Sequence, residues 1–319
     1  MKTTGRLLLA LCAALVSSYA SSQGYPAKPV RVVVPFAPGS GTDGVARIVF
    51  QALGERMNAQ FVVDNRAGAN AIIGAEFVAK SAADGYTLFM TTNTSHSANP
   101  SLYKKLPYDP VRDFTPITFT GTLPFMVVSH PSLPARNMAE LIAYAKAHPG
   151  KLAYATANST SLVTGESIKA MARIDMTAVP YKSNPNAISD VIGGQIPLMV
   201  VDFVTGIPHV RSGKMKVLAV TTSKRSGFLP EVPAMGETLA GFDLTSWNGT
   251  MGPAGLGRDI VVRLNTELQQ VLARQEIKDK LANIGFEVAP MGPEAFGDYI
   301  RQQVAYWGKM IKAAGIQPE

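Results

Sequence analysis

The chain has 319 residues and a formal net charge of +7, with 46% hydrophobic and 17% charged residues. Its basic side chains are scattered and form no long run interleaved with aromatic residues, which argues against a nucleic-acid-binding protein. The length exceeds that of a usual single hydrophobic core and favours two domains. Cys12 is the single cysteine, so an internal disulfide and a cysteine metal site are excluded.

The N-terminus has the pattern of a cleavable export signal. Lys2 and Arg6 precede an apolar run at 7–16, and the small-residue sequence Ser17-Ser18-Tyr19-Ala20 follows it. The run is about half of the roughly 20 apolar residues that a membrane-spanning helix needs. We therefore predict a signal peptide at residues 1–20 and a periplasmic mature protein, whose formal charge falls from +7 to +5 when Lys2 and Arg6 are removed.

Strand-like and helix-like segments alternate in the first third of the chain. β-Branched runs alternate with segments whose apolar residues recur at helical spacing. This βαβαβ order is typical of a parallel sheet with helices on both faces. The predicted elements are strands at 30–34, 61–63 and 87–90 and helices at 42–57 and 72–81.

A second set of alternating elements begins near residue 125 and predicts a second α/β lobe. Its predicted strands are at 125–128, 152–155, 177–179 and 198–201, and its predicted helices are at 138–147, 162–172 and 185–193.

The last third contains a predicted strand at 217–221, a Gly/Pro-rich segment with Trp247, and amphipathic helices at about 258–284 and 294–314. These helices have no sheet of their own, so we expect them to pack on the first lobe. The chain would then cross between the lobes twice, near 120–124 and 220–226. The prediction is an α/β protein with two Rossmann-like lobes, a two-segment hinge and a ligand cleft between the lobes. Lobe 1 would comprise residues 21–122 and 222–319, and lobe 2 residues 123–221.

The loop at 35–43 directly follows the first predicted strand and opens the first helix. Its glycines let the backbone approach a ligand, and the free amides of a helix N-terminus favour an anion. An ordinary turn, in which Ser40, Thr42 or Asp43 only caps the helix, explains the same residues. Because a carboxylate would repel an anionic ligand, we expect Asp43 to cap the helix.

The same loop matches the dinucleotide-binding pattern G-x-G-x-x-G. Gly39, Gly41 and Gly44 occupy the glycine positions, and Asp64 follows about twenty residues later. A nicotinamide-dependent oxidoreductase is therefore an alternative. The prolines before the glycines and the export signal argue against it.

Three other strand ends carry polar residues. The turn at 157–161 offers small hydroxyl and amide groups at a helix N-terminus, the segment at 92–96 includes Asn93 and His96, and Asp202 and Phe203 follow a buried strand. Carboxyl ends of parallel strands are where such folds bind ligands. A structural hydrogen bond explains His96 equally well.

Patterns of catalysis are missing from the sequence. There is no G-x-S-x-G elbow, and the histidines are isolated, without H-E-x-x-H spacing. We expect no enzymatic activity, no catalytic residue, no cofactor and no metal site.

With these residues in view, the chain resembles the Bug-type receptors of tripartite tricarboxylate transporters over essentially the whole mature sequence. The segments that carry the resemblance are Val33–Asp43, Asp64–Asn70, Ala83–Leu88, Asn99–Tyr103, Val179–Lys182, Leu218–Thr221 and Pro230–Pro233. The resemblance implies a type II periplasmic binding protein fold whose lobes close on a small organic carboxylate. It also implies a two-component membrane permease as partner.

The resemblance and the strand-end analysis together give one set of candidate ligand contacts. In lobe 1 they are Phe36, Gly39, Ser40, Gly41, Thr42, Asp43, Asn93 and His96. In lobe 2 they are Asn158, Ser159, Thr160, Ser161, Asp202 and Phe203.

Departures from the family pattern suggest a ligand class. Phe203 stands where asparagine is common, and Asn248-Gly249-Thr250 follow Trp247 where an apolar residue is more usual. A larger apolar wall would suit an aromatic dicarboxylate such as terephthalate, a phthalate-type compound. Aliphatic di- or tricarboxylates and acidic amino acids are the alternatives. A monomeric transport receptor is expected, and a ligand sensor with a signalling partner is the other possible role.

Overall fold

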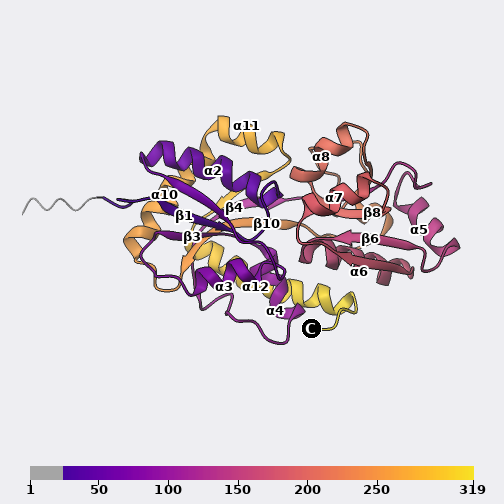
Figure 1. Cartoon of the computed structure of the whole chain (residues 1–319), viewed down its shortest axis with the longest axis horizontal. Helices are drawn as coiled ribbons and strands as arrows, with labels where there is room; N and C mark the ends of the chain where they lie inside the picture. Colours follow the sequence, from indigo (N-terminus) through magenta and orange to yellow (C-terminus); the bar gives the residue numbers. More distant parts are fainter. Residues whose placement is uncertain (1–23) are drawn as a thin grey trace, which may run out of the picture.

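The structure, a computed structural model, describes residues 24–319 as two lobes that lie side by side (Figure 1). The predicted signal peptide and Cys12 lie outside the described residues. Lobe 1 holds both ends of the described chain, and lobe 2 holds its middle. Within residues 24–319, no helix is long and apolar enough to cross a membrane.

Lobe 1 is built on a mixed sheet of six strands. They are β1 (Val30–Val34), β2 (Phe61–Asn65), β3 (Thr87–Thr92), β4 (Phe114–Leu123), β10 (Ser246–Pro253) and β11 (Glu287–Met291). Their order is β11-β4-β10-β3-β1-β2. β1 pairs in parallel with β2 and β3, as the βαβαβ pattern predicts, whereas β10 is antiparallel to β3 and β4.

The lobe 1 sheet is covered by helices, among them the three helices of the C-terminal part of the chain. They are α2 (Gly41–Met57), α3 (Ile72–Ala79), the π-helical turn η1 (Thr94–Ala98), α4 (Asn99–Leu102), α10 (Arg258–Ala273), α11 (Gln275–Asn283) and α12 (Pro293–Ala313). α10 packs against α2, and α12 packs against β4, so the expected return to lobe 1 is confirmed. The single helix predicted at 258–284 is two helices, because Arg274 between them is extended, with φ −65° and ψ 129°.

Lobe 2 is built on five strands in the order β7-β6-β8-β5-β9. They are β5 (Phe125–Ser129), β6 (Leu152–Thr156), β7 (Met176–Pro180), β8 (Leu198–Asp202) and β9 (Lys216–Val220). β6 is parallel to β7 and β8, and β5 is antiparallel to β8 and β9. The helices are α5 (Met138–Ala147), α6 (Ser159–Ala172), α7 (Asn184–Ile192), α8 (Phe203–Arg211) and α9 (Met235–Thr238).

The chain crosses between the lobes at two places. In the first, only Pro124 separates β4 of one sheet from β5 of the other, within the predicted range of 120–124. After β9 the chain stays with lobe 2, because Val220 pairs with Ala234, and Leu229 and Val232 enter the lobe 2 core. The return to lobe 1 therefore lies between Ala234 and β10, later than the predicted boundary at 222.

Two long strands, β4 and β10, have no counterpart among the predicted elements. β4 contains Pro116 and Gly121, and β10 is rich in glycine, so their composition is unlike that of a regular strand. Gly249 is required in β10, because a Cβ at this position would overlap the ring of Phe296. Packing of β10 against α12 thus requires a glycine at this position, although glycine in the local sequence suggests a loop.

Candidate functional site

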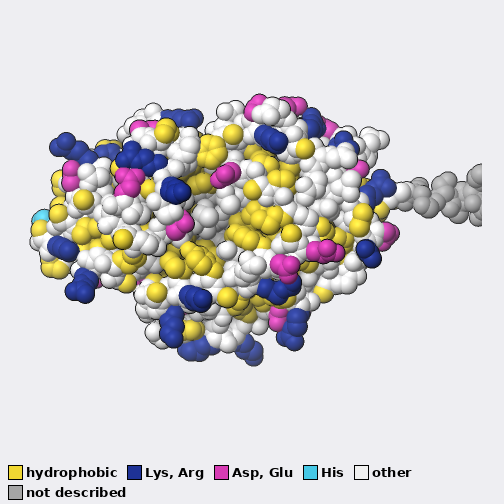
Figure 2. Space-filling view, turned by 180° about the vertical axis from the view of Figure 1, so that it is seen from behind, with side chains coloured by type: hydrophobic (Ala, Val, Ile, Leu, Met, Phe, Trp, Pro, Cys, Tyr) yellow, Lys and Arg dark blue, Asp and Glu magenta, His cyan; other side chains and the backbone are white. Residues whose placement is uncertain are grey.

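A narrow polar cavity, here called the deep cavity, lies between the two lobes. The centre of a water molecule can move in only about 20 Å³ of this cavity. The two lobes are therefore close together in this structure. Its walls come from both lobes and consist of Phe36, Ser40, Gly41, Thr42, Thr92, Thr94, Leu123, Phe125, Ala157, Asn158, Thr160, Asn184, Asp202 and Ser246. The molecular face in Figure 2 is hollowed where the lobes meet, and its Lys and Arg side chains are scattered.

Three helices begin at this cavity. Their N-cap residues, Ser40 of α2, Asn158 of α6 and Asp202 of α8, all line it. The free amides and the dipole of a helix N-terminus favour an anion. No Lys or Arg is among the lining residues. The arrangement can therefore bind an anion mainly through backbone amides, hydroxyls and side-chain amides.

The lobe 1 loop is shaped by its glycine and its cap. Gly39 has φ +80°, a conformation that glycine adopts without strain. The hydroxyl of Ser40 accepts a hydrogen bond from the amide of Asp43 at 3.3 Å, which caps α2. Gly41 and Thr42 follow directly and line the deep cavity.

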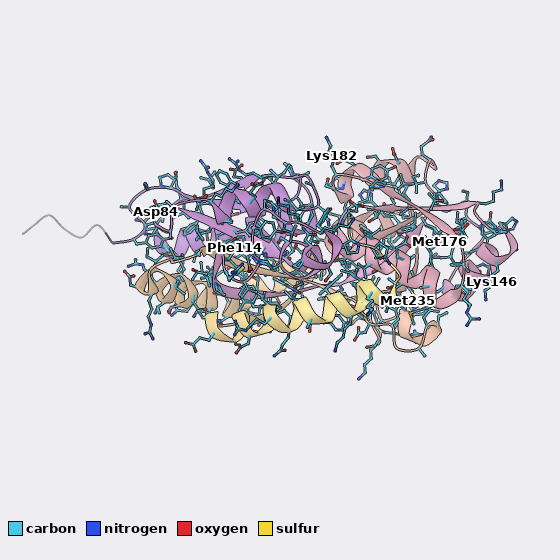
Figure 3. The ribbon with its side chains drawn as sticks, turned by 90° about the horizontal axis from the view of Figure 1, so that it is seen from below. Asp84, Phe114, Lys146, Met176, Lys182 and Met235 are labelled. Atoms are coloured by element: carbon cyan, nitrogen blue, oxygen red, sulfur yellow. The ribbon has the colours of Figure 1, made fainter. Side chains whose placement is uncertain are left out.

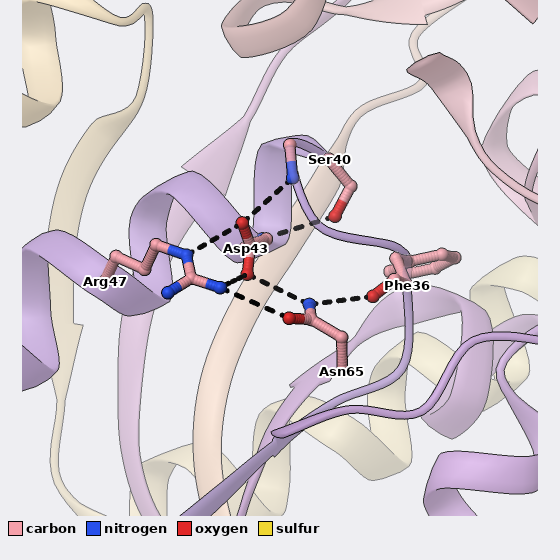
Figure 4. A network of polar contacts seen from close by, with 6 residues as sticks. Phe36, Ser40, Asp43, Arg47 and Asn65 are labelled. Atoms are coloured by element: carbon pink, nitrogen blue, oxygen red, sulfur yellow. Dashed lines mark hydrogen bonds and ion pairs between the residues drawn. The ribbon is translucent and has the colours of Figure 1, made fainter. Parts of the chain in front are cut away.

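Asp43 faces away from the deep cavity and ties the loop together (Figure 4). Its carboxylate accepts hydrogen bonds from the amide of Gly39 at 2.9 Å, from Arg47 at 3.0 Å and from Asn65 at 2.9 Å. Burial alone would raise the pKa of Asp43, but these hydrogen bonds and the Arg47 charge lower it. Asp43 therefore remains ionised and braces the loop, but the expectation that it caps the helix is wrong, because Ser40 is the N-cap of α2.

Asp202 faces Gly41 across the lobe boundary. Its carboxylate accepts hydrogen bonds from the amide of Thr205 at 2.8 Å and from the side chain of Asn184. Burial raises its pKa, and the hydrogen bonds from Thr205 and Asn184 oppose that rise. A Cβ at Gly41 would overlap this carboxylate, so only glycine lets the two lobes approach as they do here.

The lobe 2 turn forms a capping box. Asn158 Oδ1 accepts a hydrogen bond from the amide of Ser161 at 2.9 Å, and Ser161 Oγ accepts one from the amide of Asn158 at 3.2 Å. Ser161 also accepts a hydrogen bond from the amide of Ala157 at 2.9 Å. Ser161 therefore shapes the turn and does not line the cavity, whereas Asn158 does.

Ser159 and Thr160 contact lobe 1 directly. Asn70 Nδ2 donates to Ser159 Oγ at 2.7 Å, and Asn93 Nδ2 donates to Thr160 Oγ1 at 2.8 Å. We call these two contacts the interlobe hydrogen bonds. They bring Asn93, Ser159 and Thr160 together, and among these three Thr160 also lines the deep cavity. The closed arrangement is thus held partly by protein groups of both lobes.

A wider cavity, here called the outer cavity, adjoins the deep cavity. Its volume is about 570 Å³. Phe36, Ala157 and Asn158 line both cavities, so the two are parts of one cleft. The remaining walls are Gly68, Ala69, Asn70, Ala71, Tyr103, Thr156, Leu162, Ala178, Pro180, Tyr181, Lys182 and Glu319.

His96 lies in the core of lobe 1 and lines neither cavity. It is fully buried, its Nδ1 lies 2.6 Å from Thr91 Oγ1, and its ring packs edge-on against Phe114 at 4.4 Å between centroids. Burial lowers its pKa to about 3, so the imidazole is neutral at physiological pH. This placement fits the structural alternative for His96.

Phe203, a predicted contact, and Trp247 also lie in the cores of the lobes. Phe203 is fully buried in lobe 2, 6.4 Å from Phe228 between ring centroids. Trp247 is fully buried in lobe 1 against Phe296 and Tyr299. Phe203 therefore does not form the larger apolar wall that was expected, and the aromatic residues on the deep cavity are Phe36 and Phe125.

Several lining residues were not among the predicted contacts. They come from strand ends and helix starts that meet only in the folded protein, and they are Thr92, Thr94, Leu123, Phe125, Ala157, Asn184 and Ser246. Asn70, which reaches across the lobes, lies in the segment Asp64–Asn70 that carries the family resemblance. Thr92, Thr94 and Ala157 lie in the polar strand ends at 92–96 and 157–161, so the sequence marked their segments but not these residues.

The glycines of the dinucleotide-like pattern face lobe 2. A Cβ on Gly39 would lie 3.8 Å from Pro185, and one on Gly44 would lie 3.3 Å from Val204. Close approach of the lobes explains Gly41 and Gly44, and the positive φ explains Gly39, without a dinucleotide. Within residues 24–319, no group of three or more His, Cys, Asp or Glu side chains could hold a metal ion.

The chain is similar to known proteins over nearly its full length. Residues 45–316 match the family described as the tripartite tricarboxylate transporter family receptor, TctC. The UPF0065 protein in the tcbD-tcbE intergenic region of Pseudomonas sp. strain P51 is 32% identical over 96% of this chain and 93% of its own.

Solved structures show the same fold. The R. palustris protein Rpa4515 with adipate has a TM-score of 0.91 and 34% identity, covering 93% of this chain and 100% of its own. The periplasmic binding protein BugD has a TM-score of 0.88 and 33% identity, covering 92% and 100%. MatC of Rhodopseudomonas palustris with bound malate has a TM-score of 0.84 and 28% identity, covering 90% and 100%. With two α/β lobes and a polar cleft between them, the chain belongs to the tripartite tricarboxylate transporter receptor family and is a solute-binding receptor of the Bug type.

Proposed function

We propose that this receptor captures a small organic carboxylate, in the first instance a dicarboxylate, in the cleft between its lobes. The observation that carries the proposal is the meeting of three helix N-termini, α2, α6 and α8, at a cavity lined by no Lys or Arg. One carboxylate there would accept hydrogen bonds from amides and hydroxyls of both lobes. Each contributes on the order of 1 kcal/mol net, and more when the acceptor is charged.

Aliphatic dicarboxylates are the first candidates, because the similar solved structures contain adipate and malate. Terephthalate is the second candidate. Its support rests on Phe36 and Phe125, which line the deep cavity, since Phe203 and Trp247 do not. A flat aromatic acid would need to stack on Phe36 at the junction of the deep and outer cavities.

The role that follows is delivery of the ligand, without turnover, to a two-component membrane permease. The support for this partner is family membership. We propose that the receptor acts in the periplasm as a monomer. A ligand favours the closed state only through the additional contacts it makes when both lobes surround it.

A thermal-shift screen of residues 21–319 tests the proposal. The panel contains adipate, malate, citrate, glutamate and terephthalate, with NAD and NADP included. A ligand that binds only the folded state raises the melting temperature by mass action. We expect the largest increase with an aliphatic dicarboxylate; a terephthalate response alone would favour the aromatic ligand. Stabilisation by NAD alone would overturn the receptor function.

A further inference from the structure

The charges around the cleft are unevenly distributed. The deep cavity has no basic side chain among its lining residues, and the outer cavity has one, Lys182. Lys182 lies on the lobe 2 side, just after β7, and Glu319 lies on the lobe 1 side. Within residues 24–319, Lys182 makes no ion pair. A lysine that makes no ion pair therefore borders the wider part of the cleft, with Glu319 on the opposite wall.

The backbone on both sides of Lys182 is fixed. The amide of Tyr181 donates to the carbonyl of Thr156 at 2.7 Å, and its hydroxyl donates to Asp190 at 2.6 Å. Ser183 is buried and precedes Asn184, whose side chain holds Asp202 at the deep cavity. The stem of Lys182 thus starts from a segment that is anchored in lobe 2 and joined to the wall of the deep cavity. Figure 3 places Lys182 where the lobes meet, whereas Lys146 lies at the far end of lobe 2.

We propose that the outer cavity is the subsite for the second carboxylate of a dicarboxylate and that Lys182 is its counter-charge. This inference rests on the proposed function, because it places the first carboxylate at the helix N-termini of the deep cavity. The ligand chain would pass Phe36, Ala157 and Asn158, which line both cavities. Glu319 repels an anion on the opposite wall, so the second carboxylate binds on the Lys182 side. Lys182 therefore selects dicarboxylates over monocarboxylates of equal length.

The solvent exposure of Lys182 determines how much its removal should weaken dicarboxylate binding. Lys182 is exposed, and ion pairs in contact with water are weak and screened by salt. Its removal should weaken dicarboxylate binding about three- to fivefold without abolishing it. Monocarboxylates of equal length, which place no charge in the outer cavity, should be unaffected.

Calorimetric titration of residues 21–319 tests the inference with matched pairs of acids. The pairs are adipate with hexanoate and terephthalate with 4-methylbenzoate, which differ by one carboxylate. We expect Lys182→Gln to lower the affinity for the diacid that binds by about three- to fivefold and to leave that for the matched monoacid within about twofold. Lys182→Arg should keep the diacid affinity. Lys146→Gln, an exposed lysine of α5, is the control and should change neither.

Salt gives a second readout. Raising NaCl from about 20 mM to about 0.5 M should reduce the diacid preference of the native protein but not that of Lys182→Gln. An unchanged diacid affinity in Lys182→Gln, or an equal loss for both members of a pair, would overturn the subsite and leave the receptor function standing. Failure of the native protein to bind any of the four acids would overturn the proposed function as well.

Discussion

Asp43 and Asp202 place two carboxylates beside a cleft that we propose binds an anion. Asp43 is ionised, but Gly39, Arg47 and Asn65 satisfy it on the side away from the cleft. Asp202 lines the cleft and uses its oxygens to cap α8 and to hold Asn184. Because each carboxylate is already hydrogen-bonded within the protein, the free donors of α2 and α6 remain available to a ligand.

Gly41 provides a direct mutational test of the cleft. Gly41→Ala puts a methyl group against the Asp202 carboxylate only when the lobes are closed, so it should disfavour closure and leave each lobe intact. We expect ligand affinity to fall at least about tenfold, which corresponds to about 1.4 kcal/mol. Calorimetry measures the affinity, and thermal unfolding without ligand reports the stability.

Gly227→Ala is the matched control, because a Cβ at Gly227 meets no atom within 4 Å. This variant should bind as tightly as the native protein. If Gly41→Ala also kept the native affinity, ligand binding would not require the closed arrangement seen here.

The segment Gly68–Ala71 connects β2 to α3 in an unusual conformation. Ala69, Asn70 and Ala71 have φ values of 45°, 48° and 71°, in the left-handed region that non-glycine residues rarely adopt. Such residues cost on the order of 1–3 kcal/mol each and persist only where the surroundings hold them. Asn70 and Asn99 supply such contacts, with Asn99 Nδ2 donating to the Asn70 carbonyl at 2.8 Å. The strain places Asn70 where it can reach Ser159 of lobe 2.

The interlobe hydrogen bonds should stabilise the closed state. Replacing Ser159 and Thr160 together by alanine removes both, each worth on the order of 1 kcal/mol, so the closed population should fall about tenfold or more. We expect weaker ligand binding by calorimetry and a larger radius of gyration by solution X-ray scattering, with no loss of folding.

Met171→Ala on the exposed face of α6 is the control for this pair and should change neither quantity. A double-mutant cycle between Asn93 and Thr160 measures their coupling directly. Zero coupling together with an unchanged radius of gyration would show that these contacts do not hold the lobes together.

Local sequence predicts the strand-to-helix turns of the site better than the other residues that line the deep cavity. Ser40–Thr42 and Asn158–Thr160 each follow a strand and open a helix, so cap chemistry marks them in the sequence. Asn184 also opens a helix, α7, behind the N-cap Ser183, but nothing local shows that this helix start reaches the cavity, and Ser246 carries no cap signal. Their place at the cavity depends on β10 entering the lobe 1 sheet and on α7 approaching α8, which are tertiary arrangements.

Phe203 and Trp247 show that a residue next to a site position need not itself face the cleft. Both are large apolar residues next to polar site positions, and the sequence does not say which side of the backbone faces the cleft. In the structure Phe203 turns into the lobe 2 core while its neighbour Asp202 lines the cavity. Trp247 alternates with Ser246 in the same way along β10, where successive side chains point to opposite faces.

At the scale of the whole molecule, the two-lobed fold itself is well marked in the sequence. Alternating strand and helix patterns predict two α/β units, and the C-terminal helices without a sheet predict the return to lobe 1. The position of that return is harder to predict, because residues such as Leu229 and Val232 pack with lobe 2 after β9 has ended. Closure then depends on contacts between residues far apart in the chain, such as Asn93 and Thr160.

A crystal structure of residues 21–319 with the dicarboxylate that binds most tightly tests the central claim most directly. We expect the lobes to be closed, with one carboxylate within about 3.2 Å of amides or hydroxyls in 40–42 and 158–160. A ligand bound outside the interlobe cleft, or bound to one lobe while the other stays apart, would contradict the account.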